Sequence, residues 1–193
     1  MLSKILSRES CAACKFCCSF RRQSLWETPL FPPEVVEKLS KPNEYGVVGE
    51  FTPVSCQKQN ARATQDVHER GNARDLQNAY RLVLENNYRT DDPEEEVPCS
   101  FLDPNRGCIL KPEDKPFDCS IWPLRIMDKD GELVIALTPT CPSIGATPRP
   151  ELIELVKNGL GKKIFEYAKT HPYIIKEYKE GFPKLKSLGV VPF

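Results

Sequence analysis

Four cysteines lie within eight residues in the stretch "ESCAACKFCCSF": Cys11, Cys14, Cys17 and Cys18. Thiolate sulfur is a soft ligand that suits Zn²⁺, Cu(I) and iron–sulfur clusters. The C-x2-C-x2-C spacing of the first three is typical of the loop that binds an iron–sulfur cluster in bacterial ferredoxins, where a remote cysteine completes the ligand set. This spacing predicts a cluster-binding loop, although the fourth cysteine follows earlier than in that loop.

Cys17 and Cys18 are adjacent, which bears on how many sites the thiols form. Consecutive side chains of an extended segment point to opposite sides. We therefore expect Cys17 and Cys18 to face opposite ways and to bind two different sites that share a wall.

Four more cysteines follow in the second half of the chain, and these distal cysteines are Cys99, Cys108, Cys119 and Cys141. Zinc sites with four cysteines usually use two C-x2–4-C pairs, and the distal cysteines are too widely spaced to supply the second pair. We expect Cys11, Cys14 and Cys17 to bind one [4Fe–4S] cluster with one distal cysteine. Cys18 and the remaining distal cysteines are then available for a second cluster, with structural zinc as the alternative.

The ninth cysteine, Cys56, has no cysteine neighbour, and we interpret it as a free thiol or a small core residue. A disulfide framework is the alternative for the whole set, but it belongs to short secreted chains. The N-terminal "MLSKILSRES" is too short and polar for a signal peptide. These features favour metal binding in a reducing cytoplasm.

The composition suits a single domain spanning 1–193, with 40% hydrophobic residues. Lys plus Arg and Asp plus Glu number 27 each, so no overall field favours nucleic acid or an acidic membrane. No run approaches the roughly 20 apolar residues that span a bilayer. We expect no nucleic-acid or membrane partner.

The elements that must position the thiols are short. Hydrophobic spacing and turn residues predict a β-hairpin around the turn Asp128–Gly131. The stretch 98–124 holds five prolines and three cysteines without an amphipathic period, so its thiols should point inward to a common centre. The same signals predict a short strand near 47–51 and helices at 33–41, 72–84, 150–171 and 172–181.

The expected fold is therefore irregular α+β: a metal-centred, cysteine-rich core with a β-hairpin and four or so peripheral helices. The core would span 11–145 and a C-terminal helical extension 146–193. We interpret His68 and His171 as surface or helix-end residues, because neither has a ligand partner at H-x3–5-H spacing. Basic residues that could balance thiolate charge cluster near the cysteines: Lys15, Arg21, Arg22, Arg106, Lys111, Lys115 and Arg125.

The cysteine pattern resembles the CxxCxxCC cysteine-cluster family, a group of zinc- or iron-chelating (YkgJ-like) proteins to which flagellin lysine N-methylase is related. "CAACKFCC" is similar to its opening motif, and "PCSFLDPNRGCIL", "KPFDCSIWPL" and "CPSIG" are similar to its later blocks. The resemblance covers 11–145 in separate pieces. It implies metal binding by the same eight cysteines.

This chain departs from the family at two positions that are usually arginine, where it has Lys115 and Ser120. Trp122 and Ser143 replace a usual Phe and Gly. The resemblance leaves three functions open: electron transfer or assistance to a partner enzyme by an iron–sulfur protein, structural zinc binding, and a methyltransferase-like group transfer. The chain carries no recognisable motif for a cosubstrate.

Overall fold

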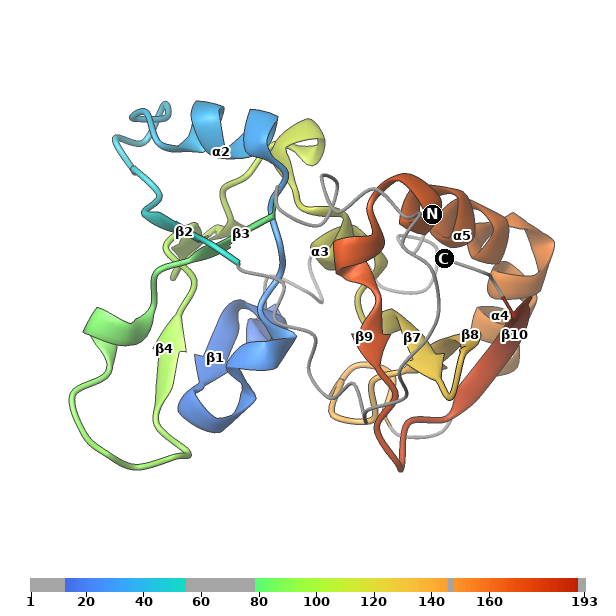
Figure 1. Ribbon diagram of the computed structural model, residues 1–193. Helices are drawn as coiled ribbons and strands as arrows, with labels where there is room; N and C mark the ends of the chain where they lie inside the picture. Colours follow the sequence, from blue (N-terminus) through green and yellow to red (C-terminus); the bar gives the residue numbers. More distant parts are fainter. Residues whose placement is uncertain (1–12, 55–78, 146–147, 191–193) are drawn as a thin grey trace, which may run out of the picture.

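The computed structural model describes residues 13–54, 79–145 and 148–190 (Figure 1). Within these residues the chain is a mixed α+β protein of short helices and small sheets, which confirms the expected class. Cys11, Cys56, His68 and most of the helix expected at 72–84 lie outside the described residues. No helix in the described ranges is long and apolar enough to cross a membrane.

The largest sheet has the strand order β10-β8-β7-β9. β7 (Leu124–Lys129) and β8 (Glu132–Leu137) form the expected antiparallel hairpin. Its turn places Asp130 and Gly131 at φ values of 54° and 88°, the left-handed conformation that a tight hairpin turn requires. β10 (Lys184–Val190) runs antiparallel to β8, and β9 (Lys176–Glu177) runs parallel to β7.

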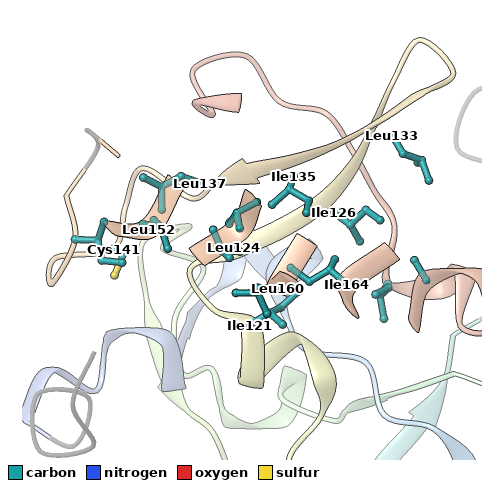
Figure 2. Packing of buried hydrophobic residues seen from close by; sticks show 14 residues of the cluster. Ile121, Leu124, Ile126, Leu133, Ile135, Leu137, Cys141, Leu152, Leu160 and Ile164 are labelled. Atoms are coloured by element: carbon teal, nitrogen blue, oxygen red, sulfur yellow. The ribbon is translucent and has the colours of Figure 1, made fainter. Parts of the chain in front are cut away.

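One face of this sheet is covered by α4 (Pro150–Leu155) and α5 (Gly161–Thr170), which a π-helical turn (Val156–Leu160) connects. The helix expected at 150–171 is therefore present, with its interruption at Gly159, whose φ is 131°. The helices pack apolar side chains onto alternate residues of β7 and β8 (Figure 2). This main cluster includes Leu124, Ile126, Leu133, Ile135, Leu137, Cys141, Leu152, Leu160 and Ile164.

The opposite face of the hairpin carries a small second cluster, because side chains alternate along a strand. Met127, Val134 and Ala136 pack there with Phe182. Arg125 belongs by alternation to the same face as Met127, so its side chain does not enter the main cluster. Because of this alternation, the side chain of Arg125 on β7 points towards the N-terminal half, where it contacts Glu27.

The N-terminal half has its own apolar cluster around Phe31, Leu82 and Phe101. Three two-stranded sheets surround it: β1 (Ser19–Arg21) with β4 (Glu96–Pro98), β2 (Phe51–Pro53) with β3 (Tyr80–Leu82), and β5 (Leu102–Asp103) with β6 (Gly107–Cys108). The expected helix at 33–41 is α2 (Pro33–Leu39), and α3 (Phe117–Ile121) lies between the two halves in Figure 1.

Two expected helices are wrong where the structure describes them. The end of the helix expected at 72–84 is β3, because Tyr80–Leu82 pairs with β2. The helix expected at 172–181 is a 3₁₀ turn (Pro172–Ile174) followed by β9. The C-terminal segment is therefore only partly helical: it carries α4 and α5, but also β9 and β10, which form both edges of the largest sheet. In both cases pairing with a distant strand overrides local helical spacing.

Candidate functional site

Cys17 and Cys18 lie in one 3₁₀ turn, η2 (Phe16–Cys18), which begins after Lys15 in a left-handed conformation at φ 53°. The amide of Cys18 donates to the carbonyl of Lys15 over 3.0 Å. The Cys17 thiol is hydrogen-bonded to the sulfur of Cys18. The expectation that these two side chains face opposite ways is therefore wrong: successive residues of a 3₁₀ turn are about 120° apart, not 180° as in a strand.

The second cysteine segment is tied to the first by backbone pairing. The amide of Cys99 donates to the carbonyl oxygen of Cys18 over 2.7 Å. This bond continues the ladder between β1 and β4, in which Ser19 lies opposite Pro98. Cys18 and Cys99 are therefore cross-strand neighbours, and such neighbours place their side chains close together.

Cys108 and Cys119 approach from the same irregular stretch as Cys99. Cys108 lies on β6, opposite Leu102 of β5. Cys119 lies on α3, which Phe117 fixes by stacking on Tyr167 of α5, with ring centroids 3.9 Å apart and planes 6° apart. The stretch 98–124 is thus held near both ends, by the hydrogen bond of Cys99 and by the stacking of Phe117.

Five thiols from these segments line one cavity of about 430 Å³. The volume falls in the range of ligand pockets, about 300–1,000 Å³. Apolar side chains, among them Phe20, Phe31 and Trp122, form much of the remaining wall. The thiols of the cavity belong to Cys17, Cys18, Cys99, Cys108 and Cys119.

Cys141 is placed differently, just beyond β8 at one end of the main apolar cluster (Figure 2). Burial raises the pKa of the Cys141 thiol, while the amides of Ile144 and Ser143 donate to its sulfur and oppose the rise. The charges of Cys14 and Cys17 also raise this pKa. Cys141 therefore lies within electrostatic reach of the N-terminal loop rather than in the cavity wall.

Three thiols of the cavity, those of Cys17, Cys99 and Cys119, have raised pKa values, which favours their neutral form. The hydrogen bond to Cys18 and then burial raise the pKa of Cys17 far above its ordinary value. Burial raises the pKa of Cys99 to about 12 and that of Cys119 well above its ordinary value, and neighbouring thiolates add to both effects. A nucleophilic cysteine needs a lowered pKa, so these thiols suit ligation by a positive group rather than covalent catalysis.

A buried ion pair forms another part of the wall. Arg125 and Asp118 are only 3% and 2% exposed, with Nη1 and Oδ1 3.7 Å apart. Nη2 of Arg125 donates to the carbonyl of Glu27 over 3.0 Å, and the guanidinium lies 4.7 Å from the ring centroid of Trp122. Burial raises the pKa of the Glu27 carboxyl. The sequence singled out Arg125 but missed Asp118, although it directly precedes Cys119.

The described residues contain no group of three His, Cys, Asp or Glu side chains close enough to hold a metal ion as they stand. The seven described cysteines form no disulfide. His171 follows the last turn of α5, as expected, and stacks on Tyr167 with ring centroids 4.0 Å apart. The structure thus brings five expected ligands around a cavity, with Cys141 within electrostatic reach of Cys14 and Cys17.

The fold and site define a mixed α+β protein with a thiol-lined cavity beside its N-terminal apolar cluster, whose Phe20, Phe31 and Leu110 lie in the cavity wall. Comparisons of the chain with protein-family models, with curated proteins and with solved structures give no match. The assignment of function therefore depends on the chemistry of the cavity.

Proposed function

We propose that this protein binds one or two [4Fe–4S] clusters through its cysteines and serves in electron transfer or as an accessory to a partner enzyme in the cytoplasm. The observation that carries the proposal is that thiols from four segments converge on one cavity. These segments are η2, the residue that follows β4, the strand β6 and the helix α3. The proposed ligands are Cys11, Cys14, Cys17, Cys18, Cys99, Cys108, Cys119 and Cys141.

The size of the cavity favours a cluster over a single zinc ion. Four thiolates at Zn–S distances of about 2.3 Å surround one ion, with sulfurs only about 3.8 Å apart. Here five cysteines from four segments line a space of about 430 Å³. Each iron of a cluster takes its own thiolate, so a cluster fits thiols that surround a volume.

The donor set fits iron chemically as well. Metal ligation would replace the proton of each thiol, and the positive charge of the metal would stabilise the buried thiolate. Backbone amides already donate to two of the sulfurs: that of Phe101 to Cys99, and those of Ser143 and Ile144 to Cys141. Hydrogen bonds of this kind stabilise thiolate and tune bound metal.

The electrostatic neighbours suggest how the ligands divide. Cys141 is influenced by Cys14 and Cys17, whereas Cys99 and Cys119 are each influenced by Cys108 and Cys17. Cys141 is therefore the best candidate for the distal ligand that joins Cys14 and Cys17. The second set would be Cys18, Cys99, Cys108 and Cys119, adjacent to the first through the hydrogen-bonded pair Cys17 and Cys18.

Bound iron–sulfur groups supply one-electron chemistry, and the resemblance to the CxxCxxCC family agrees with a metal–thiolate role. The test is spectroscopic. Protein purified without oxygen should be brown, absorb near 400 nm, and lose this absorbance on reduction with dithionite. A colourless protein with zinc alone would contradict the proposal.

A further inference from the structure

Four positively charged side chains line the thiol cavity: Arg21, Arg106, Lys115 and Arg125. Three of them already have a partner. Arg21 contacts Glu96 at 2.8 Å, and Arg125 contacts Asp118 at 3.7 Å. Arg106 lies 5.1 Å from the ring centroid of Tyr45 and acts electrostatically on Asp103. Their charges are therefore partly balanced within the protein.

Lys115 differs from these three. It follows the 3₁₀ turn η6 (Pro112–Asp114), is half-buried and lines the cavity. Throughout the part of the chain that the structure describes, no acidic side chain forms an ion pair with Lys115. Its charge acts on Cys17, where it partly offsets the effects of the Cys18 hydrogen bond and of burial.

We propose that Lys115 is the counter-charge of the thiolate-bound group and raises its reduction potential. This inference rests on the proposed function. A cluster held by four thiolates is anionic, and a one-electron reduction makes it more negative without breaking a bond. A fixed positive charge nearby stabilises the reduced form more than the oxidised form, and net charge is among the factors that set cluster potentials.

Matched variants separate the charge of Lys115 from its packing. Lys115→Gln removes the charge and keeps similar length, whereas Lys115→Arg keeps the charge. Lys111→Gln is the control, because Lys111 is 57% exposed, lies 4.0 Å from Glu44 and does not line the thiol cavity. All three are made in the full-length chain and titrated with dithionite without oxygen, following absorbance near 400 nm.

We expect Lys115→Gln to shift the midpoint potential to a more negative value, while Lys115→Arg and Lys111→Gln stay at the wild-type value. Loss of iron from Lys115→Gln but not from Lys115→Arg would equally support the inference that the bound group requires a positive charge at position 115. An iron-loaded Lys115→Gln variant with the wild-type potential would overturn the inference, as would loss of iron from both Lys115 variants. Iron and sulfide in the wild-type protein are measured first, so failure of the proposed function is recognised separately.

Discussion

The carbonyl oxygen of Cys18 accepts a hydrogen bond of 2.7 Å from the amide of Cys99, although the two residues are 81 positions apart in the chain. This bond, at the end of the ladder between β1 and β4, fixes the N-terminal cysteine turn beside the irregular stretch that carries Cys108 and Cys119. Cys18 and Cys99, which this bond joins, both line the thiol cavity.

Replacement of Cys99 by serine should reduce bound iron and labile sulfide to about half or less of the wild-type content, because one cluster loses a ligand. The measurement is iron and sulfide per chain after purification without oxygen. Cys56→Ser is the matched control, since Cys56 is not among the proposed ligands. Equal iron in Cys99→Ser and wild type would remove Cys99 from the ligand set.

The buried pair of Arg125 and Asp118 should stabilise the fold that supports the cavity. Arg125→Met removes the ion-pair partner of the Asp118 carboxylate, which is 2% exposed, and removing one partner of a buried pair costs about 3–5 kcal/mol. Urea unfolding should show this loss. The double variant Arg125→Met with Asp118→Asn should be less destabilised than the sum of the single variants, and strict additivity would show that the two residues do not interact.

Glu95 should make stability depend on pH in acid. The amide of Arg89, the hydroxyl and amide of Thr90, and the charge of Arg22 lower the pKa of Glu95 from 4.5 to about 2. Because the folded protein has the lower pKa, the stabilisation is complete above pH 4.5 and is lost as the pH falls from 4.5 towards 2. The difference in unfolding free energy between wild type and Glu95→Gln should shrink over this range, and a constant difference would contradict the assignment.

Truncation of a side chain in the main apolar cluster should lower the stability of the protein without changing its metal content. Ile164 is fully buried beneath the hairpin (Figure 2). Ile164→Val should cost about 0.5–1.5 kcal/mol and Ile164→Ala about 2–5 kcal/mol, because truncation leaves a cavity. Both variants should keep the wild-type iron content per folded chain. Loss of iron in proportion to lost stability would show that this core and the metal site form one cooperative unit.

Local signals in the sequence predicted several elements. The turn Asp128–Gly131 between alternating apolar runs predicted the hairpin of β7 and β8, and Pro33 with Val35, Val36 and Leu39 predicted α2. The helix expected at 150–171 is present as α4 and α5, with a π-helical turn at Gly159. These features depend on residues close together in the chain.

Features that depend on distant pairing were missed. Helical spacing around Tyr80–Leu82 and Lys176–Glu177 did not indicate strands, because each pairs with a segment far away in sequence. The relative orientation of the Cys17 and Cys18 side chains was also missed. The prediction took the backbone to be extended, but Lys15 is left-handed and the two cysteines lie in a 3₁₀ turn. The five thiols of the cavity were nevertheless all identified from residue type and spacing.

Binding of iron–sulfur groups in the thiol cavity is tested by measuring iron, zinc and labile sulfide together in the full-length protein purified without oxygen. We expect iron and sulfide in equal amounts, about four of each per chain for one cluster or about eight for two, with little zinc. One or two zinc ions per chain, without iron or sulfide, would contradict it.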